Sequence, residues 1–114
     1  MELSRQDIGN VRLITVEDGR IDASVAIRFK DRMREVAEDA PARIILDLSR
    51  VTFLDSSGLG ALVAVMKMAA PDRRVELAGL TKMVAKVFRL TRMDTIFTIH
   101  ASAETALNGH ADAG

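Results

Sequence analysis

The side chains best suited to chemistry stand together where one predicted helix begins, in the run Asp55-Ser56-Ser57-Gly58-Leu59-Gly60. The first backbone N–H groups of a helix have no partner within the helix. A serine hydroxyl at this point can cap one of those groups, and the helix dipole favours an anion at the same place. The local fold would therefore tolerate a phosphoryl group on Ser56 or Ser57.

Two glycines follow these serines, and each costs a helix about 1 kcal/mol relative to alanine. Some contact should offset that cost. Gly58 and Gly60 allow either close packing of the helix on a sheet or close approach of a partner's backbone to this turn. On residue types alone a plainer interpretation stays open, in which Asp55-Ser56-Ser57 is only a helix cap and the glycines serve only packing.

A serine nucleophile is a further hypothesis, and the sequence offers it few partners. The chain has no cysteine and only two histidines, His100 and His110, both near its C-terminal end. Neither histidine has the spacing of a metal site, although His100 could approach Ser56 in space. The run around Ser56 also lacks the Gly-x-Ser-x-Gly elbow of the α/β-hydrolases. We therefore expect a protein that is not an enzyme and holds no metal.

Other polar residues have both a structural and a functional interpretation. Asp22 is predicted to N-cap the first helix, and Asp47, at the end of a buried strand, to accept hydrogen bonds from loop N–H groups. A later predicted helix carries a basic stripe made of Lys82, Lys86, Arg89 and Arg92. This stripe is either a solvated face or a contact for an acidic partner, a nucleotide or another protomer.

Alternating strands and helices position these residues. Apolar and β-branched runs predict strands over Val11–Val16, Ala42–Leu48, Val75–Ala78 and Thr95–Ile99, with Glu2–Gln6 as a hairpin partner of the first. Apolar periodicity predicts helices over Ala23–Asp39, Ser57–Ala70, Lys82 to about Thr91, and Ala103–Leu107. Thr81 and Ser102 are the expected caps of the last two helices. This order predicts the α/β class, a mixed, mainly parallel sheet of about five strands with about four helices.

The composition is that of a soluble globular domain, with 48% hydrophobic and 28% charged residues over 114 positions. The 16 Lys and Arg balance the 16 Asp and Glu, and Trp and Tyr are absent, which argues against binding to nucleic acid or membrane. The N-terminus lacks the apolar core of a signal peptide, and the longest apolar stretch is too short to span a bilayer. We expect a cytoplasmic protein with one domain, residues 1–107, and a flexible tail, residues 108–114.

The run from Phe53 to Leu62, FLDSSGLGAL, follows a predicted buried strand and resembles the signature of STAS domains. It is most similar to that of the bacterial anti-sigma factor antagonists, also called anti-anti-sigma factors. Upstream, Gly19-Arg20-Ile21-Asp22 resembles the Gly-x-Leu-Asp turn that precedes the first helix of this family. The order of elements and the length match as well, so the resemblance covers nearly the whole chain. It implies a single-domain STAS-like fold and a regulatory phosphoprotein that needs no cofactor.

The resemblance also implies a role in transcription regulation, in the stress response, by partner switching. The unphosphorylated protein would bind an anti-sigma factor of the GHKL serine kinase type and release the sigma factor, which it affects only indirectly. Phosphorylation of Ser56 would abolish that binding, and a PP2C-like Ser/Thr phosphatase would restore it. The implied partner-binding residues are Asp22, Asp55, Ser56, Ser57, Gly58 and Leu59.

Two other functions stay open. One uses the same fold and is a STAS subunit of a lipid-transport ABC complex or of a larger stress-signalling assembly. The other is a nucleotide-binding sensor. The serine available at position 56 favours the kinase-regulated antagonist.

Overall fold

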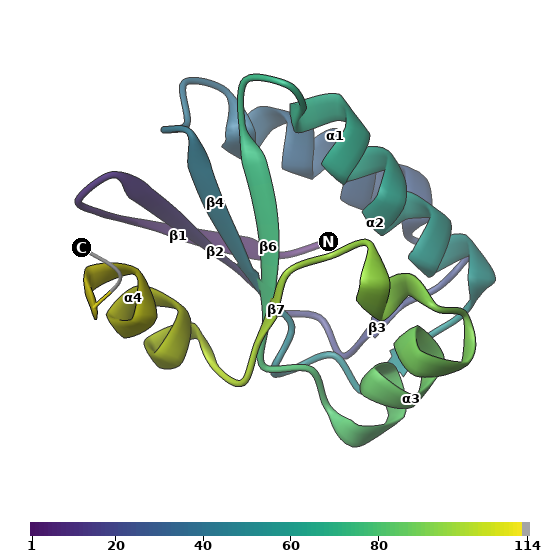
Figure 1. Ribbon diagram of the computed structural model, residues 1–114. Helices are drawn as coiled ribbons and strands as arrows, with labels where there is room; N and C mark the ends of the chain where they lie inside the picture. The colour runs from purple at the N-terminus through teal and green to yellow at the C-terminus, as the bar shows by residue number, and fades with distance from the viewer. Residues whose placement is uncertain (113–114) are drawn as a thin grey trace.

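A mixed five-stranded sheet with helices on both faces forms the centre of the computed structural model, which describes residues 1–112, with side chains through Asn108 (Figure 1). The strand order is β1-β2-β4-β6-β7. The strands are β1 (Leu3–Ile8), β2 (Val11–Val16), β4 (Arg43–Asp47), β6 (Arg74–Ala78) and β7 (Ile99–His100). β1 and β2 form an antiparallel hairpin, and every other neighbouring pair is parallel. The predicted α/β class and the mainly parallel sheet are confirmed.

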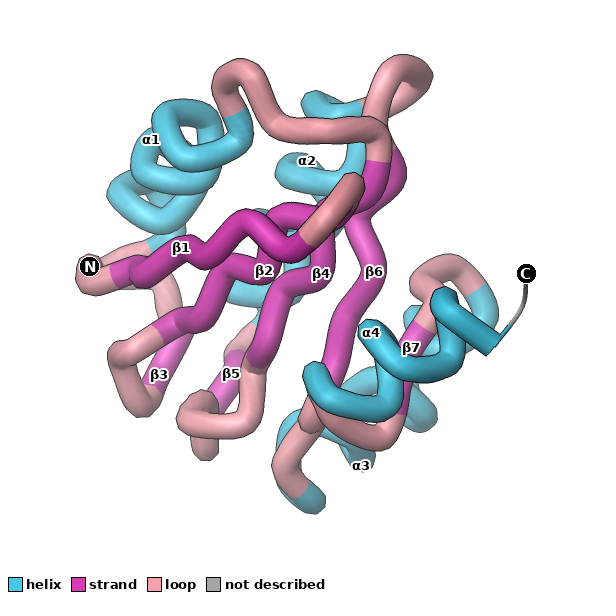
Figure 2. The backbone as a smooth tube through the Cα atoms, turned by 90° about the vertical axis from the view of Figure 1, so that its left-hand side faces the viewer, coloured by secondary structure: helices cyan, strands magenta, loops and turns pink. Residues whose placement is uncertain are grey.

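Helices α1 (Ala26–Ala37) and α2 (Ser56–Ala69) pack side by side on one face, while α4 (Ala103–Asp112) covers the other (Figure 2). Helix α3 (Lys82–Leu90) lies at the edge where the parallel strands end (Figure 1). The main core fills the space between the sheet and α1, α2 and α3. Its fully buried large side chains include Ile14, Phe29, Met33, Ile44, Leu46, Leu62, Leu77 and Phe88.

A smaller core lies under α4 and consists of Val11, Ile45, Ala78 and Ala106. Side chains alternate between the two faces of a strand. On β4, Ile44 and Leu46 therefore enter the main core while Ile45 enters the smaller one. This arrangement confirms the prediction that this strand is buried on both faces, and it explains why its sequence is almost continuously apolar.

A second, two-stranded parallel sheet joins segments that are far apart in the sequence. β3 (Arg20–Ile21) pairs with β5 (Phe53–Leu54), with Arg20 opposite Phe53 and Ile21 opposite Leu54. The carbonyl of Gly19 also accepts a hydrogen bond from the N–H of Thr52, at 2.8 Å. This short sheet brings the turn before α1 next to the start of α2.

The ends of several elements differ from the prediction. The predicted strand Thr95–Ile99 is wrong over most of its length, because a 3-10 turn (Met93–Thr95) replaces its start and β7 holds only Ile99–His100. Arg92, directly before this turn, has a φ of 62° and so lies in the left-handed region, outside an extended path. Phe97 consequently points into the main core, where its ring packs edge-on against Phe88 at 5.8 Å.

The predicted helix caps have mixed outcomes. Ser102 caps α4, since its hydroxyl accepts the Thr105 N–H at 3.0 Å, whereas Thr81 does not cap α3 and donates to the Val51 carbonyl at 2.7 Å instead. Asp47 accepts the Ser49 N–H at 2.9 Å, as predicted. The backbone of α4 continues to Asp112, past the predicted helix end at Leu107. Residues 113–114, the end of the predicted tail, lie outside the described residues.

Within residues 1–112, no helix has the length and apolar character needed to cross a membrane. Among the side chains that the structure describes, those of residues 1–108, no three His, Cys, Asp or Glu gather to hold a metal ion.

Candidate functional site

Ser56 is the first residue of α2, and its side chain is exposed. No hydrogen bond from the described side chains, those of residues 1–108, or from the backbone of residues 1–112 engages its hydroxyl, which is thus open to another molecule. Ser57 beside it is also exposed. The hydroxyl therefore stands at a helix N-terminus, where backbone geometry favours added negative charge.

The carboxylate of Asp55 fixes the backbone around this hydroxyl. Its Oδ1 accepts the N–H of Gly58 at 2.8 Å and so N-caps α2. Its Oδ2 accepts the N–H of Ala23 at 3.1 Å, which ties the turn before α1 to the start of α2. Since Asp55 is the cap, neither serine is needed for capping, and the interpretation in which a serine caps α2 is wrong.

Asp22 lies in the turn before α1, one residue before Ala23, but it does not cap α1. Helix α1 begins at Ala26 after Val25, so the predicted N-cap role of Asp22 is wrong. Its Oδ1 instead accepts hydrogen bonds from the hydroxyl and the N–H of Ser24, at 2.6 and 3.0 Å. These Ser24 contacts, with a further one from Arg20, hold the pKa of the Asp22 carboxyl below its ordinary value.

The two glycines of the run have different surroundings. Gly58 is buried, and a Cβ at this position would overlap the carbonyl oxygen of Ile21 and lie 2.8 Å from Leu54 Cδ1. Close packing of α2 on the short sheet therefore explains Gly58. Gly60 is exposed, and a Cβ there would have no heavy atom within 4 Å. Packing within the chain does not explain Gly60.

Apolar side chains are found near Ser56 in the sequence and on the turn tied to it. Leu59 is half-buried and packs against the main core. Ile27 on the first turn of α1 is 69% exposed, and Phe53, two residues before the Asp55 cap, is 36% exposed. The Arg20 guanidinium lies over the Phe53 ring, 4.9 Å from its centroid. An exposed hydroxyl bordered by apolar side chains and fixed carboxylates is suited to contact with another protein.

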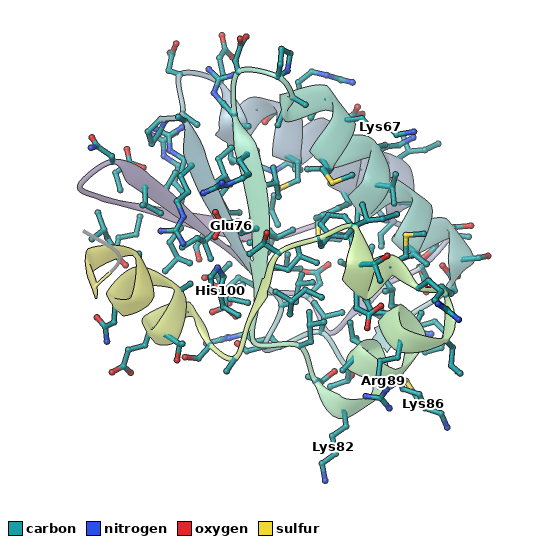
Figure 3. All side chains as sticks on the ribbon, viewed as in Figure 1. Lys67, Glu76, Lys82, Lys86, Arg89 and His100 are labelled. Atoms are coloured by element: carbon teal, nitrogen blue, oxygen red, sulfur yellow. The ribbon has the colours of Figure 1, made fainter. Side chains whose placement is uncertain are left out.

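The serine nucleophile hypothesis finds no support in this geometry. His100 lies on β7, and its Nε2 is 2.6 Å from Glu76 Oε1, on the α4 side of the sheet (Figure 3). The prediction that His100 could approach Ser56 is therefore not fulfilled. Within the described side chains, no histidine is placed to accept the proton of the Ser56 hydroxyl.

A buried cluster around Glu76, which was not predicted from the sequence, joins β4, β6, β7 and α4. Arg43 holds the Glu76 carboxylate with two hydrogen bonds, at 2.8 and 2.9 Å, and also donates to the Ala106 carbonyl at 3.2 Å. Burial alone would raise the pKa of Glu76, but the hydrogen bonds and charges of Arg43, with His100 and Arg74, lower it to about 2. The sequence signal for this cluster is a charged residue in each of two apolar strands, Arg43 in β4 and Glu76 in β6.

Comparison with known proteins gives consistent results. The family model described as STAS domain matches residues 3–106. An anti-sigma-B factor antagonist of Listeria monocytogenes is 30% identical over 114 residues, covering 96% of this chain and 95% of the relative. The anti-sigma-F factor antagonist RsfB of Mycobacterium tuberculosis is 28% identical over 91 residues, covering 80% and 75%. The crystal structure of an anti-sigma factor antagonist from Mycobacterium paratuberculosis superimposes with a TM-score of 0.83 at 25% identity, covering 95% and 92%.

Proposed function

Since the chain belongs to the STAS domain family, as its relatives named anti-sigma factor antagonists also indicate, we propose that it acts in the cytoplasm as an anti-sigma factor antagonist. Its unphosphorylated form binds an anti-sigma factor and so releases the sigma factor. The observation that carries this proposal is the exposed Ser56 hydroxyl, which has no hydrogen bond to any described residue although Asp55 fixes the backbone around it.

Ser56 is the proposed phosphorylation site, and the chemistry of transfer comes from the partner. Nothing near Ser56 in the described side chains provides an imidazole base. A GHKL-type anti-sigma factor with serine kinase activity would supply the base and ATP, and the Ser56 oxygen would take the γ-phosphoryl group. A PP2C-like phosphatase would remove it.

The phosphate is expected to block docking without unfolding the domain. It adds about −1.5 to −2 charges at pH 7, and a helix N-terminus accommodates them. Two unit charges about 4 Å apart interact by about 4 kcal/mol at an effective dielectric of about 20. Half of that energy, acting against a partner carboxylate, weakens binding more than tenfold. The carboxylate of Asp55 beside Ser56 adds to the negative charge of the surface.

Gly60 has a proposed place in the same docking surface. Residues four apart on a helix lie on one face, so Gly60 stands one turn beyond Ser56 on the face that presents the hydroxyl. The absent side chain leaves room for a partner's backbone close to Ser56. Asp22, Asp55, Ser57 and Leu59 keep their proposed roles at this surface, whereas the buried Gly58 contributes through its packing against Ile21.

The direct test incubates the protein with each GHKL-type kinase of the same organism and ATP, followed by mapping of any phosphate by mass spectrometry. We expect a single phosphate on Ser56, none on a Ser56→Ala variant, and an unchanged yield for Ser57→Ala as the neighbouring control. A phosphate on another residue overturns the site assignment. Capture of an ABC transporter subunit in place of a kinase would favour the lipid-transport alternative.

A further inference from the structure

The outer face of α3 carries three cations on successive turns, Lys82, Lys86 and Arg89, which we call the basic ridge (Figure 3). All three are exposed, and none forms a salt bridge with another described residue. Arg92, the fourth member of the predicted stripe, lies beyond the end of α3 in a left-handed conformation and does not belong to the ridge.

Two exposed apolar side chains run beside the basic ridge. Met83 is 54% and Leu90 is 74% exposed, and residues seven apart share one side of a helix. The opposite side of α3 is already occupied, because Val84 and Phe88 are fully buried in the main core. The outer face therefore combines positive charge with apolar area that the chain itself does not cover.

The N-terminal part of the basic ridge is electrostatically unfavourable within the isolated domain, whereas Arg89 in the last turn suits the helix dipole. Lys82 is the first residue of α3, where the helix dipole favours an anion, and the first turn holds no acidic residue. Lys82 and Lys86 are four apart, and Lys86 and Arg89 are three apart, so like charges repel along the ridge. No described carboxylate forms a salt bridge with these three cations, and a partner's carboxylates would relieve the repulsion between them.

Helix α3 adjoins the surface that presents Ser56. It packs against β5, and the hydroxyl of Thr81, just before α3, donates to the Val51 carbonyl at 2.7 Å. Two residues after Val51, β5 begins and leads directly to Asp55 and Ser56. Figure 1 shows α3 and the start of α2 at the same end of the molecule.

We infer that the outer face of α3 is a second contact for the anti-sigma factor and binds an acidic surface with apolar residues beside it. This inference rests on the proposed function. A protein partner suits the face better than a nucleic acid or a membrane, because Met83 and Leu90 have no role in phosphate contact and no aromatic side chain is exposed on α3 for base stacking. The apolar side that a membrane helix would insert is buried in the domain's own core.

The test measures binding of the anti-sigma factor to charge-reversed variants by calorimetry, together with the thermal midpoint of each variant. In Lys82→Glu, an acid stands at the helix N-terminus and can pair with Lys86, so we expect an unchanged or raised Tm and a weaker complex. For the triple variant K82E/K86E/R89E we expect the Kd to rise at least tenfold. The wild-type Kd should also rise more steeply with salt concentration than that of the triple variant.

Lys67→Glu is the matched control, because this exposed cation on α2 receives the same charge change at a position away from α3 (Figure 3). It should bind as the wild type does. If the triple variant also binds as the wild type does while Ser56→Glu does not, the α3 contact is refuted and the proposed function stands. If the triple variant loses only retention on phosphatidylglycerol vesicles or DNA, the contact is likewise refuted. If the wild type binds no anti-sigma factor, the α3 contact and the proposed function are both refuted.

Discussion

Two polar clusters lie on opposite sides of the sheet, and they use their charges differently. Under α4, both carboxylate oxygens of Glu76 are engaged by Arg43, and its side chain is only 2% exposed. At the start of α2, both carboxylate oxygens of Asp55 are also engaged, but they order the backbone around the exposed Ser56 hydroxyl, which has no hydrogen bond to a described residue.

The difference separates a structural cluster from a candidate functional one. The Glu76 cluster joins β4, β6, β7 and α4 through hydrogen bonds among its own members, although Arg43 Nη1 is buried without a partner among the described residues, so these charges act within the fold. The hydrogen bonds of Asp55 fix the backbone around Ser56, whose hydroxyl has no hydrogen bond among the described residues. A well-positioned polar group without an internal partner is the one that a second protein can use.

The largest expected effect comes from breaking the buried pair. Arg43→Ala leaves the Glu76 charge buried without its main partner and should lower the free energy of unfolding by about 3–5 kcal/mol in urea denaturation. Arg74→Ala is the control, because Arg74 touches the same carboxylate from a side chain that is 71% exposed and should cost less than about 1 kcal/mol. Equal losses for the two variants would contradict the structural role of the Arg43 pair.

The pH dependence of stability should come mainly from the same buried cluster. The pKa of Glu76 is lowered to about 2 in the folded protein, whereas an unfolded glutamate titrates near 4.3. The unfolded chain therefore binds the proton first as pH falls, and roughly 2–3 kcal/mol of stability should be lost between about pH 5 and pH 2. Urea denaturation of Glu76→Gln, which has no such proton to bind, should show a smaller pH slope over this range; an identical slope would refute the assignment.

The two glycines of α2 are expected to differ in role, Gly58 in packing within the domain and Gly60 in binding of the partner. Gly58→Ala forces a Cβ against the Ile21 carbonyl and should destabilise the domain by about 1–3 kcal/mol. Gly60→Ala meets open space and should stabilise α2 by up to about 1 kcal/mol, yet it should weaken binding of the anti-sigma factor. Thermal unfolding and calorimetry on both variants separate the two effects. A Gly60→Ala variant that binds as tightly as the wild type would show that this position does not meet the partner.

A smaller effect is expected when the Asp55 carboxylate becomes an amide. In Asp55→Asn the remaining oxygen can still cap α2 through the Gly58 N–H, but the amide nitrogen cannot accept the Ala23 N–H. Stability should fall by about 1 kcal/mol, and hydrogen exchange should quicken at Ala23 while staying unchanged at Gly58. Equal acceleration at both positions would mean that the hydrogen bonds of Asp55 to Gly58 and to Ala23 do not form independently.

The sequence predicted elements whose signal is local. The apolar run over Ile44–Leu46 predicted a buried strand, and Asp55-Ser56-Ser57 predicted the start of α2 to within one residue. The start of α1 was predicted too early, at Ala23. An aspartate that binds Ser24 in a turn has the same sequence signature as a helix cap, so Asp22 could not be told from one.

The missed features depend on residues that are distant in the sequence. The two-residue strands β3 and β5 are too short for periodicity, and they exist because segments 20–21 and 53–54 meet in the fold. The pairing of Arg43 with Glu76 arises in the same way, from neighbouring parallel strands. Residue types alone also could not separate Gly58 from Gly60, since only the position of the Ile21 carbonyl distinguishes them.

The most direct test of the proposed switch compares the Ser56-phosphorylated and unphosphorylated protein in binding to its anti-sigma factor, with the Tm of both forms measured in parallel. We predict that the phosphate raises the Kd at least tenfold while the Tm stays within a few degrees, because the hydroxyl has no contact to lose within the domain. An equal Kd for the two forms would contradict the proposed role of Ser56.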